Sequence, residues 1–313
     1  MAEEGGDLLV LVGATASGKS QVALELARRV GGEIVSGDSM QVYRYMNVGT
    51  AKPSLSDRAL VPHHLIDTHF PDEEFSVAAY QRLAREAISS VAARGRLPIL
   101  AGGSWLYIRA VTDCYCFVEV ETDWGMREAL AAEARERGTA ELHRRLARVD
   151  PATAAWVHPH DLRRIVRALE VYHRTGRPIS ELQRSQPSAL PYRLTMIGLD
   201  VGRPELYARI DARVDHMVRA GLREEVRALL ARGYSPSLRS MQALGYKEMA
   251  AHLMGRTTLE EAVSQIKRGT RSLARRQLIA FRRDRRIIWV QASVSPSAAV
   301  EGIEKFLEGK WNR

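Results

Sequence analysis

The chain has 313 residues, 45% of them hydrophobic, and 46 lysines and arginines against 37 aspartates and glutamates give it a net charge of +9. This length can bury a full core and hold two domains. No stretch approaches 18 apolar residues and the N-terminal MAEEGGD is acidic, so we expect neither a membrane span nor a signal peptide, and a soluble, cytoplasmic protein. Two cysteines, Cys114 and Cys116, exclude a disulfide framework and a four-ligand zinc site, and we expect them to be packing residues.

The segment from Leu8 to Val30 predicts a phosphate-binding loop between a strand and a helix. Residues 8–12 form an apolar run of strand length, residues 22–30 carry apolar side chains at helical spacing, and GATASGKS between them fits the pattern G-x-x-x-x-G-K-S/T. Loop N–H groups and the helix N-terminus bind phosphate oxygens, the lysine adds a charge, and the serine hydroxyl can hold Mg²⁺. We expect two linked phosphates here, bound by Gly13, Ala14, Thr15, Ala16, Ser17, Gly18, Lys19 and Ser20.

Two further strands are predicted to end beside this loop. Residues 33–36 lead directly into Asp38, and residues 97–101 lead into Gly102, Gly103 and Ser104. Ligands bind at the carboxyl ends of parallel strands, so Asp38 should lie near the phosphates as a Mg²⁺ ligand, a general base or a helix N-cap. The two glycines predict either a second close approach of backbone to ligand or an ordinary tight turn. We expect residues 47–71, with three prolines, to be loop with little helix.

The middle of the chain differs from the rest in its composition and pattern. Residues 123–192 are arginine-rich, helical in pattern and almost free of strand signals, and residues 161–172 form one helix that ends at Gly176. Strand signals return at residues 193–200 and 287–290, with a long helix between them. We therefore predict an α/β fold: a P-loop NTPase-like core with a parallel sheet flanked by helices, formed by residues 1–119 and 193–313, and an inserted all-helical subdomain, residues 120–192.

A basic stretch follows near the C-terminus. From Lys267 to Arg286 there are nine basic residues and one acid, Asp284, and we place them on a final helix. One face of that helix would carry Arg268, Arg271, Arg275, Arg282 and Arg286. So uneven a face suits the phosphate backbone of a nucleic acid, and the alternative is a solvated or membrane-facing basic helix.

Seven motifs, in this order and spacing, resemble the bacterial-type tRNA dimethylallyltransferases. They are GATASGKS at 13–20, DSMQVYR at 38–44, GTAKP at 49–53, PHHLID at 62–67, RALEVY at 167–172, GYKE at 245–248 and RQ at 276–277. The resemblance implies transfer of a dimethylallyl group from dimethylallyl diphosphate to the exocyclic N6 amine of the adenosine on the 3′ side of the anticodon. It also implies that the loop holds an isoprenoid diphosphate with Mg²⁺ and not ATP, and that the protein is a monomer that binds the tRNA anticodon stem-loop and no membrane.

The resemblance also implies residue roles. Asp38 would be the general base, Lys19 and the loop amides would stabilise the leaving diphosphate with Mg²⁺ near Ser20, and Ser104 and Arg127 would flank the reactive base. The implied tRNA contacts are Asp38, Ser39, Met40, Gln41, Ser104, Arg127, Arg163, Arg164, Ile165, Val166, Arg167, Gln242, Ala243, Leu244, Gly245, Tyr246, Lys247, Arg275, Arg276, Gln277 and Arg282.

Three positions depart from the family pattern, namely Ala14 for proline, Ser104 for threonine and Ala280 for tryptophan. Two other classes of protein share the first part of the chain. A P-loop kinase would need no basic stretch, and a prenyltransferase acting on free adenine nucleotides would need neither that stretch nor the insert.

Overall fold

The structure, a computed structural model, describes residues 6–115, 117–118, 120–184, 192–292 and 296–311. The chain divides into two compact units: Met1–Thr112 with Pro191–Arg313, here called the core unit, and Asp113–Leu190, the helical unit. The sequence had placed these boundaries at residues 119 and 193. Cys116 lies outside the described residues, and Cys114 is half-buried.

The core unit is built on a parallel six-stranded sheet with the strand order β3-β2-β4-β1-β5-β6, which confirms the predicted fold class. Its strands are β1 (Asp7–Gly13), β2 (Glu33–Ser36), β3 (His63–His64), β4 (Pro98–Gly102), β5 (Arg193–Asp200) and β6 (Ile287–Gln291). The apolar run of β1 lies between β4 and β5, with Leu11 opposite both Ala101 and Ile197. Leu8 to Val12 are buried because helices cover both faces of the sheet at this strand.

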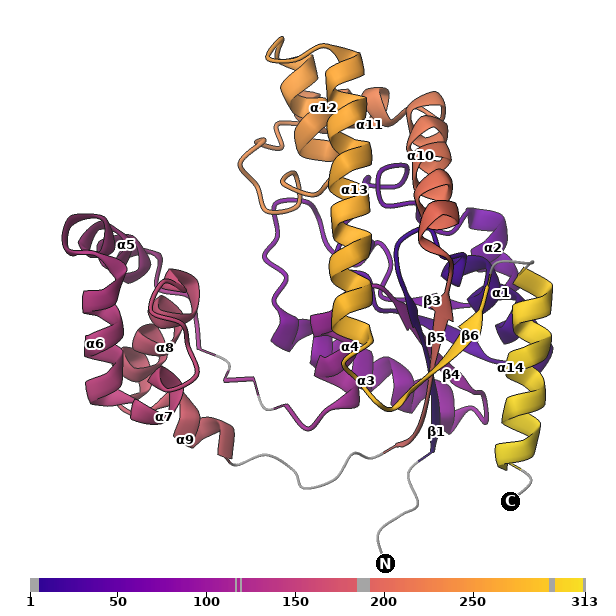
Figure 1. Ribbon diagram of the computed structural model, residues 1–313, viewed down its shortest axis with the longest axis horizontal. Helices are drawn as coiled ribbons and strands as arrows, with labels where there is room; N and C mark the ends of the chain where they lie inside the picture. Colours follow the sequence, from indigo (N-terminus) through magenta and orange to yellow (C-terminus); the bar gives the residue numbers. More distant parts are fainter. Residues whose placement is uncertain (1–5, 116, 119, 185–191, 293–295, 312–313) are drawn as a thin grey trace, which may run out of the picture. The chain divides into compact units, whose positions relative to one another are not determined.

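Helices cover the two faces of the sheet in separate groups (Figure 1). On one face α1 (Lys19–Val30) packs against α14 (Pro296–Trp311). On the other face lie α3 (Val77–Ala93), α4 (Trp105–Thr112) and α13 (Leu259–Phe281). Helix α13 also packs against α10 (Arg203–Arg219) and α12 (Tyr246–Leu253), and α12 packs against α11 (Leu222–Ala231).

One expectation about connecting segments is confirmed and another was wrong. Residues 47–71 are mostly loop, as predicted. They contain one short helix, α2 (Leu55–Leu60), which starts at a capping box of Ser54 and Asp57, and the edge strand β3, whose histidines pair with Ile34 and Val35. The expected long helix after β5 is broken between α10 and α11, because Gly221 adopts a left-handed φ of +99°.

The basic stretch does not form one helical face. Helix α13 ends at Phe281 and is followed by β6 and α14, so it is not the final helix of the chain. Arg282 is its C-cap, and Arg286 lies in the turn before β6, where its Nε and Nη2 donate to the Asp284 carboxylate at 2.9 and 2.6 Å. The local arginine count could not reveal this end because the helix has no glycine or proline there to mark it.

The helical unit contains α5 (Trp124–Arg137), α6 (Thr139–Val149), α7 (Pro151–Ala154), α8 (Leu162–Thr175) and α9 (Ile179–Arg184), as the sequence predicted. Helix α8 begins at Asp161, whose side chain accepts the Arg164 N–H, and ends at left-handed Gly176. Its buried stripe packs with α5 and α6 in a separate hydrophobic core, and that core includes Ile165 and Val166.

A buried carboxylate fixes α5 against α8. Glu170 is fully buried, and its two oxygens accept hydrogen bonds from Arg127 Nε and Nη2, both at 2.8 Å, and from Arg167 Nη1 at 2.7 Å. The Asp123 N–H adds a bond at 2.9 Å. Burial alone would raise the pKa of the Glu170 carboxyl, but the bonds from the two arginines outweigh it and hold the pKa below 4.5. Arg127 and Arg167 thus have a structural task inside the helical unit.

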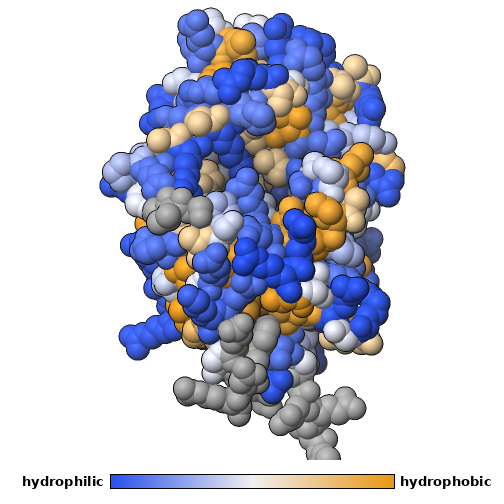
Figure 2. Space-filling model, turned by 90° about the vertical axis from the view of Figure 1, so that its right-hand side faces the viewer, coloured by the Kyte–Doolittle hydropathy of each residue, from blue (hydrophilic) through white to orange (hydrophobic). Residues whose placement is uncertain are grey.

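None of the described helices is long and apolar enough to cross a membrane. The face of the molecule in Figure 2 is mainly hydrophilic, with hydrophobic residues scattered among polar ones in small groups.

The Glu170 network predicts a pH-dependent loss of stability on substitution. Glu170→Gln leaves Arg127 and Arg167 without their counter-charge, and we expect it to lower the free energy of unfolding by about 3 kcal/mol at neutral pH. Because the folded pKa of Glu170 lies below 4.5, this contribution is present above that pH and is lost as the pH falls further. Urea unfolding of the full chain at pH 7 and pH 4 measures it. The exposed Glu128→Gln is the matched control, and equal effects of both variants at pH 7 would contradict the prediction.

Candidate active site

Three loops meet at the carboxyl edge of the sheet. They follow β1, β2 and β4, and β4 lies between the other two strands. The Ser104 N–H donates to the Gly37 carbonyl at 3.3 Å, and the Ser39 N–H donates to Ser104 Oγ at 3.2 Å. A β-carbon on Gly102 would lie 2.2 Å from the Gly37 oxygen, so only glycine lets the two loops approach this closely. The structure therefore brings Asp38 and Ser104 into one site.

The phosphate loop, residues 13–20, connects β1 to α1. Gly18, at φ +90°, and Ala16, at φ +67°, adopt left-handed conformations that turn the chain into the helix. Helix α1 has neither a side-chain cap nor an acidic residue in its first turn. Its first N–H groups and the positive end of its dipole thus have no anionic side chain of their own helix beside them, which is the arrangement that binds phosphate.

Two half-buried cations, Lys19 and Arg213, and the Asp38 carboxylate dominate the electrostatics of the site. Lys19 Nζ donates to the Ala14 carbonyl at 2.6 Å, and its ammonium is enclosed although the residue as a whole keeps some access to solvent. Burial lowers the pKa of Lys19 from 10.5 to about 7, the like charge of Arg213 lowers it as well, and Asp38 opposes both. Burial also lowers the pKa of the Arg213 guanidinium, which nevertheless remains charged. Within the described residues neither cation forms an ion pair, so the site holds excess positive charge.

Arg213 was not predicted from the sequence as a site residue. It lies on α10, whose buried stripe includes Ile210, Val214 and Met217. Residues 210, 213, 214 and 217 share one helical face, so the signal was a single arginine on an otherwise apolar stripe. Among 46 basic residues that signal is easy to overlook.

The structure excludes one of the three roles left open for Asp38. No described helix begins there: Asp38 Oδ1 accepts the Met40 N–H at 2.8 Å, which closes a turn within the loop after β2. The charge of the Asp38 carboxylate attracts the charges of Lys19 and Arg213 and so acts to raise the pKa of both. The described residues contain no cluster of three or more His, Cys, Asp or Glu side chains that could hold a metal ion by themselves.

These loops open into a cavity of about 450 Å³, here called the phosphate-loop pocket, which lies entirely within the core unit. Polar and charged side chains in its lining include Thr15, Asp38, Ser39, Ser104, Arg213, Thr270, Arg276 and Gln277. Apolar side chains in its lining include Val214, Met217, Leu222, Leu244, Ile266, Leu273 and Ala280. A ligand with an anionic group and a hydrocarbon group fits this mixed lining.

Glu225 on α11 holds another part of the pocket wall. Its carboxylate accepts the backbone N–H groups of Asn47, Val48 and Gly49 at 2.8, 2.8 and 3.1 Å, and the Tyr246 hydroxyl at 2.6 Å. A β-carbon on Gly49 would lie 2.3 Å from Tyr246 Cε2, so the backbone passes directly over the ring. Gly49 and Tyr246 both line the pocket, and this carboxylate fixes them together.

The residues that the resemblance assigns as tRNA contacts differ in their exposure to solvent. Those exposed are Arg163, Arg164, Gln242, Lys247, Arg275, Arg276 and Arg282. Ile165 and Val166 are buried in the helical unit and Tyr246 in the core unit, which leaves these side chains little surface to offer an RNA. Gln41 bonds within its own loop, where its Oε1 accepts from Ser36 Oγ at 2.9 Å.

Acids from other elements neutralise part of the basic stretch. Lys267 Nζ donates to Asp215 on α10 at 2.8 Å, Arg271 Nε donates to Asp211 on α10 at 3.1 Å, and Arg282 Nη2 donates to Asp200 at the end of β5 at 3.1 Å. Counting the single acid within residues 267–286 therefore overestimates the unpaired positive charge of this stretch. Basic side chains in this stretch that are exposed and have no ion pair in the described part of the chain are Arg268, Arg275, Arg276, Arg283 and Arg285.

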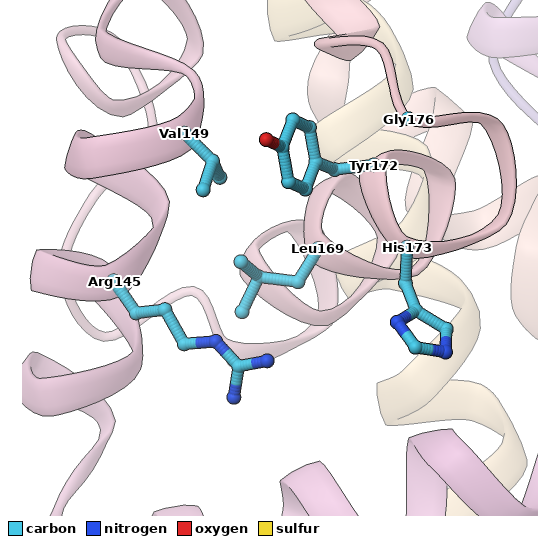
Figure 3. A pocket seen from close by; sticks show the side chains of 6 residues that line it. All are labelled: Arg145, Val149, Leu169, Tyr172, His173 and Gly176. Carbon is cyan, nitrogen blue, oxygen red and sulfur yellow. The ribbon is translucent and has the colours of Figure 1, made fainter.

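A smaller cavity of about 300 Å³ lies inside the helical unit, between α6 and α8 (Figure 3). The Val149 and Tyr172 side chains face each other across it, and its charged group is the Arg145 guanidinium. Neither a carboxylate nor a phosphate-binding loop lines it. Its lining thus offers little chemistry, and the phosphate-loop pocket is the candidate active site.

Comparisons with known proteins identify the family of the chain. The family model described as IPP transferase matches residues 41–284. The tRNA dimethylallyltransferase of Symbiobacterium thermophilum is 52% identical over 307 residues, which cover 97% of this chain and 96% of that protein. The tRNA dimethylallyltransferase of Desulforudis audaxviator is 53% identical over 283 residues, which cover 90% of this chain and 91% of that protein.

Solved structures of similar proteins share the fold. The full-length tRNA isopentenylpyrophosphate transferase of Bacillus halodurans is 42% identical with a TM-score of 0.73, and the match covers 98% of this chain and 97% of that one. A eukaryotic dimethylallyltransferase acting on tRNA is 27% identical with a TM-score of 0.76, over 92% of this chain and 74% of that one. Since the likeness runs along almost the whole chain in both sequence and fold, it confirms the resemblance seen in the motifs: the chain belongs to the IPP transferase family.

Proposed function

We propose that this chain transfers a dimethylallyl group from dimethylallyl diphosphate to tRNA, at the N6 amine of the adenosine on the 3′ side of the anticodon. The products are N6-(dimethylallyl)adenosine and diphosphate. The carrying observation is the phosphate-loop pocket, in which Asp38, Ser104 and the half-buried Arg213 line one cavity together with apolar side chains, and to which Thr15 of the phosphate loop also belongs. A short hydrocarbon on a diphosphate matches this combination of positive charge and apolar surface.

The cations would serve the leaving group. As the bond between the allylic carbon and its oxygen breaks, negative charge develops on the departing diphosphate. Lys19, Arg213 and the first N–H groups of α1 already provide positive charge at fixed positions, so they stabilise that charge without reorganising.

Mg²⁺ fits this site as a companion of the substrate. The Ser20 hydroxyl is exposed at the start of α1, and the described residues offer no all-protein metal cage. Mg²⁺ in nucleotide and phosphate sites is typically held by one or two protein oxygens together with substrate phosphates and waters. When bound through Ser20 and the diphosphate, the ion would supply further charge neutralisation on the leaving oxygens.

Asp38 would act on the other substrate. The exocyclic amine of adenine must lose a proton as its nitrogen forms the new bond to the allylic carbon, and a carboxylate can take that proton. Asp38 keeps one oxygen on the Met40 N–H, and its place in the pocket beside Ser104 leaves the other for the amine. The target base would have to leave the anticodon loop stack to reach this depth.

The tRNA would meet the exposed basic residues of α13 and α8, such as Arg275 and Arg163. Ser104 would flank the reactive base from the pocket lining. The bond network of Arg127 around Glu170 supports a more indirect part for that residue, which is to hold the helix that presents Arg163. We also expect the enzyme to work in the cytoplasm as a monomer, which sedimentation of the purified chain would test.

The proposed function predicts tRNA prenylation that depends on the Asp38 charge. Incubation of the chain with unmodified tRNA, dimethylallyl diphosphate and Mg²⁺ should yield N6-(dimethylallyl)adenosine on mass analysis of the nucleosides. Asp38→Asn keeps the shape and the turn but removes the proton acceptor, so single-turnover transfer should fall by roughly 10²- to 10⁴-fold with unchanged melting. Modification of AMP in preference to tRNA, or ATP hydrolysis in step with product, would contradict the proposal.

The lowered pKa of Lys19 predicts proton uptake on substrate binding. In the free protein Lys19 loses its proton above a pH of about 7, and a bound diphosphate favours the charged form. At pH 8 binding should therefore take up most of one proton at this residue, and the affinity should fall as the pH rises above 7. Calorimetry of dimethylallyl diphosphate binding in two buffers of different ionisation enthalpy measures the uptake. Lys19→Arg remains charged throughout, so an uptake equal to that of the parent would contradict the assignment.

The exposed basic residues of α13 predict a charge-dependent RNA affinity. Arg275→Glu should weaken tRNA binding and reduce the slope of log affinity against log salt by about one unit, because one phosphate contact is lost. Binding of dimethylallyl diphosphate should not change. Arg28→Glu is the matched control, since Arg28 is equally exposed but lies on α1, on the other face of the sheet. Equal losses of tRNA affinity in both variants would show a general charge effect instead.

A further inference from the structure

One side chain of α13 joins two of the three loops of the active site. Gln277 Oε1 accepts the backbone N–H of Thr15 in the phosphate loop at 2.8 Å. Its Nε2 donates to the backbone carbonyl of Gly103, in the loop after β4, at 3.0 Å. Both ends of the amide are therefore engaged. The two partners are 88 residues apart in the sequence and lie in the loops that follow the adjacent strands β1 and β4.

The approach of this amide depends on Gly103. A β-carbon on that residue would lie 2.7 Å from Gln277 Nε2, which is closer than real β-carbons come to any neighbour. Gly103 thus makes room for a side chain of α13, so this position is more than an ordinary tight turn. Gly102, the last residue of β4, makes room for the backbone of Gly37.

The helix that carries Gln277 is held firmly on both sides. Lys267 pairs with Asp215 of α10, and the Phe281 ring packs edge-on against Trp105 of α4 at a centroid distance of 5.3 Å. Gln277 lies between these two fixed points along α13. An amide on such a support can set the position of a loop that has two left-handed residues and no cap of its own.

The residue type suits this task. A primary amide donates and accepts at the same time, which a carboxylate cannot do and an ammonium or guanidinium cannot do either. The Thr15 N–H is bonded to Gln277 and is therefore not available to a phosphate. This part of the loop is bound to the protein instead of the ligand. Phosphate binding is left to the groups that follow, up to the start of α1.

We propose that Gln277 is a positioning residue of the phosphate loop and not a tRNA contact. It fixes Thr15 relative to Gly103, and so sets the geometry in which the loop meets a diphosphate. The inference rests on the proposed function only for its turnover readout, because diphosphate binding can be measured without tRNA.

The test uses three variants of the full chain. Gln277→Leu removes both hydrogen bonds at similar side-chain length, and Gln277→Glu keeps the acceptor for Thr15, loses the donor to Gly103 and adds a negative charge. Gln242→Leu is the matched control, an exposed glutamine with the same implied tRNA role that here donates to the Pro236 carbonyl. Calorimetry with dimethylallyl diphosphate and Mg²⁺, fluorescence anisotropy with an anticodon stem-loop RNA, and steady-state transfer kinetics give the readouts.

We expect Gln277→Leu to raise the Kd and KM for dimethylallyl diphosphate by about tenfold, as for the loss of two hydrogen bonds, with the RNA Kd within about twofold of the parent. Gln277→Glu should lose more, because its charge repels the diphosphate. Gln242→Leu should leave dimethylallyl diphosphate binding unchanged. Gly103→Ala, which displaces the amide from outside, should reproduce the selective defect and serves in place of Gln277→Leu if that variant does not fold.

Other outcomes overturn the inference. A raised RNA Kd with unchanged diphosphate binding would make Gln277 a tRNA contact. No change in either affinity would leave it without a role, and an equal loss of both with a lower melting temperature would make it a residue of the fold. A parent chain that binds the diphosphate but modifies no tRNA would refute the proposed function, while the binding data on Gln277 would still decide its own case.

Discussion

Excess positive charge enclosed at the end of the central strands is the constraint around which the core unit is organised. Burial works against the charge of Lys19, in the phosphate loop, and of Arg213, in the pocket lining, and the Asp38 carboxylate opposes this effect for both. Such a site is costly when empty and favourable when an anion fills it, so part of the binding energy of a diphosphate is prepared in advance. Preparation of this kind requires that the groups around the ligand are held in place before it arrives.

Close packing of backbone provides that rigidity. The loops after β2 and β4 touch because Gly102 lies against Gly37, and the wall opposite is held because Gly49 lies against Tyr246. In each case the absence of a β-carbon lets two segments lie in direct contact, where a side chain would hold them apart. The pocket is thus bordered by main chain at several points, where conformational freedom is smallest once the hydrogen bonds are formed.

Features that depend on local sequence could be predicted from it. Strand, loop and helix around the phosphate loop follow one another within 23 residues, and parallel strands must bring their carboxyl ends together, so Asp38 and Ser104 were placed beside that loop correctly. Features that depend on partners far along the chain could not. Asp215 and Asp211 neutralise charges that lie 52 and 60 residues away in the sequence, and Arg213 joins the site only because α10 packs against the pocket. The roles of the site residues in catalysis remain predictions.

The Glu225 carboxylate has a consequence for motion. Residues 47–49 belong to a connecting segment, yet three successive N–H groups of it end on one side chain of α11. A loop bonded in this way cannot open one residue at a time. Each amide proton can exchange with solvent only when its hydrogen bond to the shared carboxylate breaks. We infer that this segment and α11 open as a single cooperative piece, so that its amide protons exchange at the rate of a packed helix although it has no regular secondary structure.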